Sequence, residues 1–210
     1  MILFFMLAGC AFRSQDAITY HSFDYPAPAK ENEASVPETI MVYNFVLDSS
    51  VEIHALEISY SKGGEKTIIK HRWQDNPADM ITDLVLRDLS GSGLFQKAID
   101  QLGTARYRYA LEGTIRKLQG IVQNDKASAL YEIEATLIDF DAPAGKNKNL
   151  LKKTYKLEIP AKDDKPDSIV AALNQGIKEF SSQLRNDIRQ ILVKSGPKIK
   201  RETRLGFALL

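Results

Sequence analysis

A regular stripe of apolar residues near the carboxyl end constrains the fold of this chain more than any other feature of its sequence. After Pro166, Asp167 and Ser168, large apolar side chains recur at spacings of three or four, at Ile169, Leu173, Ile177, Phe180, Leu184, Ile188 and Ile191. That spacing places them along one face of a long α-helix. A helix with one apolar face packs against another apolar surface, so the rest of the chain must form that surface.

Segments rich in β-branched and aromatic residues can form this apolar surface as a β-sheet. Alternation of apolar and polar residues predicts strands at 39–47, 51–60, 67–73, 106–117, 127–140 and 151–159. In the last three segments the apolar residues fall on one face of each strand, which favours an antiparallel meander. The polar stretch 141–149 is then a long hairpin connection.

A second, shorter helix is predicted to begin at Pro77. Asn76 is a good capping residue, Pro77 suits the first helical position, and a glycine at 91 or 93 should end the helix. We therefore predict an α+β fold. It is a two-layer sandwich in which an antiparallel or mixed β-sheet packs against one short and one long helix.

The amino-terminal residues 1–9 are uninterruptedly apolar and are followed by Cys10, the single cysteine of the chain. A helix needs about 20 apolar residues to span a bilayer, so this stretch has the size of a signal-peptide core. Leu7-Ala8-Gly9-Cys10 resembles the bacterial lipobox, in which a cysteine is acylated and the leader is removed. We therefore expect residues 1–9 to be a lipoprotein signal peptide. The usual basic segment before the apolar core is missing, so we expect the start codon to lie upstream.

The lipobox resemblance implies that Cys10 carries fatty acyl chains, such as palmitate, that hold the protein on a membrane. Ala11 stands where an aspartate would retain enterobacterial lipoproteins at the inner membrane, which implies sorting to the outer membrane. The alternative is that Cys10 is an ordinary buried thiol. Its place between an apolar leader and a polar segment argues against that alternative.

Residues 10–38 show neither a helical nor a strand period and contain three prolines. They predict a tether after the lipidated cysteine, which would reach about 85 Å in polyproline geometry. Three aromatic residues either pack against the edge of the domain or form a docking segment for a partner, and we favour the first interpretation: Tyr20, Phe23 and Tyr25.

Composition argues against several functions. Lys plus Arg 28 against Asp plus Glu 27 gives a formal net charge of +1, which is too little to hold nucleic acid through many phosphate contacts. With one cysteine and 3 histidines in separate segments, we expect no metal and no cofactor beyond the lipid on Cys10. Ser92 lacks the glycine spacing of a nucleophile elbow, and Glu132 and Glu134 have the spacing of the solvent face of a strand.

We therefore expect no enzymatic activity. A secreted hydrolase would require distant residues to converge in space, and its signature would be a deep polar pocket that gathers His54 or His71 with acidic residues. The tail 196–210 is basic and then apolar. It either contacts an anionic membrane or a partner, or it is a frayed tail with solvated charges, and we favour the second interpretation.

A block in the middle of the chain resembles the ABC-type transport auxiliary lipoprotein family, which includes the paraquat-inducible-C-like lipoproteins. The family pattern joins an arginine-tryptophan pair, a polar or acidic residue, a proline, a helix ending in leucine, and a glycine exit. The residues that match are Arg72, Trp73, Asp75, Pro77, Leu89, Gly93, Leu94 and Phe95. The segment 20–28, with its aromatic residues and prolines, resembles the opening of the same family. We expect Trp73, Asp75, Pro77, Gly93 and Phe95 to have structural roles.

The resemblance implies a single α+β auxiliary domain at 39–195, held on the periplasmic face of the outer membrane. It implies a non-catalytic accessory of an ABC/MCE-type (phospho)lipid transport system that docks to the MCE-domain protein and works with the ABC permease. The alternative is an envelope-scaffold or outer-membrane assembly lipoprotein with no transport role. The oligomeric state stays open.

Overall fold

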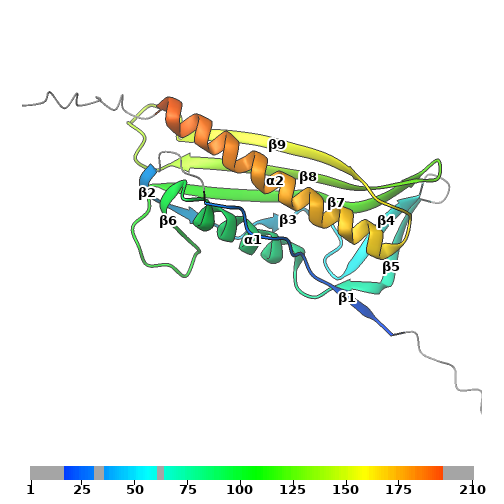
Figure 1. Cartoon of the computed structure of the whole chain (residues 1–210). Coiled ribbons are helices and arrows are strands. Elements are labelled where there is room, and N and C mark those ends of the chain that lie inside the picture. Colours follow the sequence, from blue (N-terminus) through cyan, green and yellow to red (C-terminus); the bar gives the residue numbers. More distant parts are fainter. Residues whose placement is uncertain (1–16, 31–35, 61–63, 196–210) are drawn as a thin grey trace, which may run out of the picture.

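The computed structural model of the chain describes residues 17–30, 36–60 and 64–195. These residues form an α+β fold in which a mixed sheet packs against one short and one long helix, as the sequence predicts (Figure 1). The strands are β1 (Thr19–His21), β2 (Val36–Val42), β3 (Val46–Leu47), β4 (Ala55–Tyr60), β5 (Gly64–Trp73), β6 (Phe95–Ile99), β7 (Tyr109–Gln123), β8 (Lys126–Asp139) and β9 (Asn149–Pro160). The helices are α1 (Pro77–Ser92) and α2 (Pro166–Ser195).

The three long strands β7, β8 and β9 form an antiparallel meander. The turn between β7 and β8 consists of Asn124 and Asp125, with φ values of 50° and 61°. Two consecutive residues with positive φ match the twist of a tight hairpin, and Asn and Asp tolerate that conformation. The predicted meander and the long 141–149 connection are confirmed.

The other edge of β7 carries three short strands that lie end to end and parallel to it. Residues of β2, β3 and β4 pair in turn with Tyr109–Leu111, Thr114–Ile115 and Gly120–Val122. Parallel pairing makes the sheet mixed, and β5, β1 and β6 extend it further. Periodicity did not predict β1 or β6.

Two predicted strands were too long. The segment 39–47 is interrupted after Val42, because Phe45 turns its ring into the core and its N–H donates a 2.9 Å hydrogen bond to Oγ1 of Thr82. The segment 51–60 is regular only from Ala55, because the N–H of His54 donates to a carboxylate oxygen of Glu52 at 2.8 Å. The bond between His54 and Glu52 is local, and local side-chain bonds of this kind compete with sheet pairing.

The apolar stripe of α2 is the centre of the core. Ile169, Leu173, Ile177, Phe180, Leu184 and Ile188 are all fully buried, and α2 packs over β7, β8 and β9. At Gly176 the helix approaches β8 so closely that an added Cβ would lie 2.4 Å from the ring of Tyr131. The hydroxyl of Tyr131 donates a hydrogen bond to the carbonyl of Leu173. The predicted helix is confirmed, and its apolar face is buried except at Ile191, which is only partly buried.

The shorter helix α1 has the predicted ends. The side chain of Asn76 accepts a hydrogen bond from the N–H of Ala78 at 2.9 Å, and Pro77 occupies the first turn. Gly93 follows the helix with a φ of 73°, a left-handed conformation that favours glycine. The helix thus ends at the second of the two predicted glycines.

The amino-terminal segment belongs to the packed domain earlier than predicted. β1 pairs in parallel with β5, and the chain then passes beside α1 (Figure 1). Phe23 and Tyr25 are buried, and the N–H of Asp24 donates to Asn174 of α2 at 2.8 Å. The interpretation that these aromatic residues pack against the domain therefore holds for Phe23 and Tyr25, whereas Tyr20 is 61% exposed. Part of the segment 10–38, predicted to be a tether, therefore contacts the domain.

Candidate functional site

The residues of the family motif lie around both ends of α1. Trp73 ends β5 and is buried, with its ring centroid 4.6 Å from that of Phe23. Pro77 begins α1, and Gly93 ends it. Phe95 begins β6 and is also buried. Four of the five motif residues thus lie at the ends of strands or of α1, while Asp75 is exposed. Cys10 and the basic tail 196–210 lie outside the described residues.

A buried acid joins three separate parts of the chain. Asp88 of α1 is 1% exposed, and its Oδ2 accepts hydrogen bonds from the hydroxyls of Tyr25 at 2.7 Å and Ser181 at 2.6 Å. Arg185 of α2 donates to the same oxygen at 3.3 Å. The other carboxylate oxygen of Asp88, Oδ1, accepts hydrogen bonds from Arg87. The guanidinium of Arg87 also donates to the backbone carbonyl of Tyr25. The amino-terminal segment is thereby held to both helices.

Burial is the main reason that the pKa of Tyr25 is raised above its ordinary value, and the hydrogen bond to Asp88 acts in the same direction. The phenol therefore stays protonated and keeps its donor for Asp88. Arg87 also lies over the face of the Tyr25 ring, 4.5 Å from its centroid. A cation, a hydrogen bond and burial thus all hold Tyr25, a residue of the predicted tether, in the domain.

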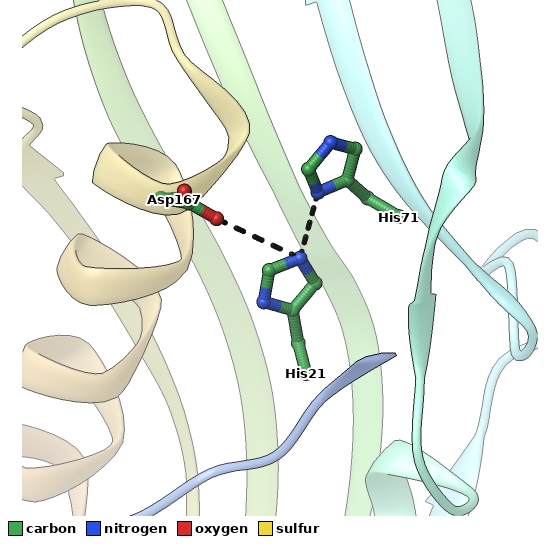
Figure 2. A group of neighbouring side chains, drawn as sticks. All are labelled: His21, His71 and Asp167. Atoms are coloured by element: carbon green, nitrogen blue, oxygen red, sulfur yellow. Dashed lines mark hydrogen bonds and ion pairs between the residues drawn. The ribbon is translucent and has the colours of Figure 1, made fainter. Parts of the chain in front are cut away.

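Two of the 3 histidines meet beside this segment. β1 and β5 pair so that Thr19 lies opposite His71 and His21 opposite Trp73, which puts both imidazoles on one face of the sheet. Nε2 of His21 lies 2.8 Å from Nδ1 of His71, and the rings are stacked with centroids 5.1 Å apart. Asp167, in the first turn of α2, approaches from the other side, with Oδ1 4.0 Å from Nε2 of His21 (Figure 2).

The surroundings favour a neutral His21. Burial lowers the pKa of His21 below its ordinary value, and the neighbouring His71 lowers it further, against an opposing effect of Asp167. The side chain of His21 is 9% exposed and that of Asp167 is 82% exposed. The His21 and His71 rings can share a hydrogen bond, with one N–H donating to the other ring nitrogen. The group thus offers two imidazole nitrogens and one exposed carboxylate.

His71 meets an acid, Asp167, but a polar cavity of the described residues lies elsewhere. A polar cavity of about 240 Å³ lies on the face of the meander opposite α2, among Glu112, Glu134, Thr136 and Lys152. Neither His54 nor His71 lines it. Glu134 forms ion pairs with Arg116 and Lys152, and Glu132 with Lys156. The two glutamates are therefore solvent-face acids paired with bases, as their spacing predicts.

Sequence reasoning missed the group of His21, His71 and Asp167 and the role of Asp88. His21 and His71 each lie next to a family-motif segment, 20–28 and Arg72-Trp73 respectively. A signal therefore existed, but nothing in the spacing indicated that the two segments pair. Neither helix of the described chain contains an apolar stretch long enough to cross a membrane.

Comparison with known proteins agrees with the family resemblance of the sequence. A family model described as "ABC-type transport auxiliary lipoprotein component" matches residues 23–185, which is more than half of the chain. No curated protein matches.

Solved structures share the fold. Protein XCC0632 from Xanthomonas campestris, of the family model DUF330, is 15% identical with a TM-score of 0.71, over 84% of this chain and 98% of that one. An uncharacterized protein is 16% identical with a TM-score of 0.63, over 82% and 99% of the two chains. The hypothetical protein CT253 from Chlamydia trachomatis is 7% identical with a TM-score of 0.50, over 73% and 98%. At these identities the likeness is one of fold.

Proposed function

Because this chain belongs to the ABC-type transport auxiliary lipoprotein family, we propose that it is a non-catalytic accessory of an ABC/MCE-type lipid transport system. The lipid on Cys10 holds it at the periplasmic face of the outer membrane, and the domain docks to the MCE-domain protein. Its role is positional: it keeps the transport conduit next to the membrane that receives the lipid.

One observation supports a positional role above all. The segment that follows the proposed lipid anchor is part of the domain core, since Phe23 packs on Trp73 and Tyr25 donates to buried Asp88. From β1 onward, the chain after the proposed anchor is therefore held to the sheet and to both helices. An anchored domain of this kind can lie only a limited distance from the membrane.

The distance from the proposed lipid anchor to the domain is shorter than the sequence alone suggests. With β1 docked from Thr19, only residues 11–18 separate the proposed lipid from the sheet. A fully extended chain of that length reaches at most about 30 Å. The described chain begins near the start of α2, and this 30-residue helix extends about 45 Å further. The helix finishes at the opposite end of the domain (Figure 1), and that end is the one we propose for the partner.

The decisive experiment is an affinity purification of the intact chain from membranes of its native host, with mass spectrometry of its amino terminus and of the co-purifying proteins. A Cys10→Ala variant, expressed at the same level, is the matched control. We expect an acylated Cys10, recovery in the outer-membrane fraction, and an MCE-domain protein in the wild-type sample.

The other outcomes separate the alternatives. An acylated Cys10 with barrel or cell-wall proteins, and without an MCE-domain protein, would favour the envelope-scaffold function. An unmodified Met1 on the mature protein would contradict the lipid anchor. Equal recovery of the partner with Cys10→Ala in the soluble fraction would show that docking does not require the anchor.

A further inference from the structure

We infer that His21, His71 and Asp167 form a binding site for a divalent transition metal ion, with Zn²⁺ as the ion that fits best. Each of the three side chains offers one ligand atom, and these atoms all lie within 4.8 Å of one another. Two imidazole nitrogens with one carboxylate are a common donor set for zinc in proteins. The site is independent of the lipid anchor and of any docking partner.

The geometry requires only small movements. Zinc binds nitrogen at about 2.0–2.1 Å, so two ligands of a tetrahedral site lie about 3.3 Å apart. Nε2 of His21 and Nδ1 of His71 are 2.8 Å apart, so the rings need to separate by about half an ångström. Asp167 lies 4.0 Å from His21 and is largely exposed, so its carboxylate is free to swing inward (Figure 2).

The chemistry of the ligands also suits a metal. Imidazole nitrogens bind metal in their neutral form, and His21 and His71 offer two of them within 4.8 Å of one another. Asp167 supplies a negative charge that two imidazoles cannot. A bound ion would take the place of the proton in the hydrogen bond that the two rings share. The d electrons of zinc impose no geometry, and zinc sites with three protein ligands hold a water in the fourth tetrahedral position.

The position of the site suggests what bound metal does. His21 lies in β1, His71 in β5, and Asp167 at the start of α2. A shared ion ties the first strand after the predicted tether to the sheet and to the long helix. It therefore stabilises the point at which the amino-terminal segment enters the domain. The sequence predicts no metal, because its histidines lie in separate segments, and His21, His71 and Asp167 are 50 and 96 positions apart along the chain.

The test is a zinc titration of the full chain, purified in detergent with an affinity tag that contains no histidine. Isothermal titration calorimetry and metal analysis after dialysis give the affinity and the stoichiometry. We expect one zinc per chain, and a loss of affinity of at least about tenfold in His21→Ala and His71→Ala. The matched control is His54→Ala, since His54 is exposed and lies outside the group; it should bind zinc like the wild type.

A third variant and a second probe distinguish a loss of metal binding from a loss of folding. Asp167→Asn changes an exposed side chain, so it should fold normally by circular dichroism and still bind zinc more weakly. Co²⁺ in place of zinc should give visible absorption bands in the wild type that are lost in His71→Ala. Absence of zinc binding in the wild type, or equal affinity in the folded His21, His71 and Asp167 variants, would overturn the inference.

Discussion

The hydroxyl of Tyr25 donates a 2.7 Å hydrogen bond to Oδ2 of Asp88, across 63 positions of sequence. Tyr25 comes from the amino-terminal segment, and Asp88 is buried in α1. The same oxygen accepts from Ser181 and Arg185 of α2. One carboxylate thus fixes the positions of three elements that have no local connection.

Removal of this bond should destabilise the domain. We expect Tyr25→Phe to lower the free energy of unfolding by about 1.5–3 kcal/mol, because the bond joins a buried donor to a charged acceptor. Asp88→Ala should cost about 3–5 kcal/mol, because it leaves the buried Arg185 without its acid. Urea denaturation measures both. Tyr20→Phe, at an exposed site, should change stability by less than about 0.5 kcal/mol; an equal effect of Tyr25→Phe and Tyr20→Phe would contradict the account.

The contact between Phe23 and Trp73 can be followed by fluorescence, because Trp73 is the single tryptophan of the chain. Phe23→Ala removes the ring that packs on it, so we expect the emission maximum to shift to longer wavelength and stability to fall by about 3–5 kcal/mol. Ile18→Ala, in the same segment but exposed, is the control and should leave the spectrum unchanged. An unshifted spectrum in Phe23→Ala would mean that the segment does not cover Trp73.

Two helical glycines should respond oppositely to the same substitution. Gly176→Ala places a methyl group 2.4 Å from the ring of Tyr131, so we expect a loss of about 1–3 kcal/mol from overpacking. Gly91→Ala meets nothing within 4 Å and should stabilise α1 by up to about 1 kcal/mol. Thermal unfolding of the two variants beside the wild type tests the close approach of α2 to β8. A stabilised Gly176→Ala protein would refute it.

Because Asp139 forms an ion pair with Arg108, we expect the stability of the domain to depend on pH. Nε and Nη2 of Arg108 donate to the two carboxylate oxygens of Asp139 at 3.0 and 2.9 Å, and this pairing lowers the pKa of Asp139 below its ordinary value. The N–H of Asp141 also donates to Asp139, and Glu38 shares Arg108. As pH falls below about 4, the unfolded chain takes up the proton first, so the stabilisation is lost.

We therefore expect Asp139→Asn to be less stable than the wild type by about 1–2 kcal/mol at neutral pH, with the difference shrinking as pH falls below about 4. Urea denaturation at a series of pH values measures this. Asp75→Asn changes an exposed acid and is the control. A difference that stays constant down to pH values well below 4 would exclude the pair as its cause.

The local signals of the sequence were sufficient for the elements that local forces determine. The stripe from Ile169 onward predicted α2, and Asn76, Pro77 and Gly93 predicted the ends of α1. Alternation predicted β7, β8 and β9, whose pairs follow one another along the chain and are joined by hairpins. A period or a cap is a property of neighbouring residues, so no knowledge of the fold is needed to recognise it.

Only the tertiary structure decided which distant segments meet. β2, β3 and β4 pair in parallel with β7, and a parallel pair depends on a crossover connection that the strand sequences do not specify. The docking of β1 on β5 brought His21 to His71, and the packing of α2 added Asp167. Likewise, the sequence around Asp88 is that of an ordinary helix residue. Only the packing of α2 and of the amino-terminal segment shows that Asp88 is buried. Because burial and long-range contact set the pKa, the ion pairs and the ligand geometry of these groups, the sequence alone could name the family and the helices but not the site.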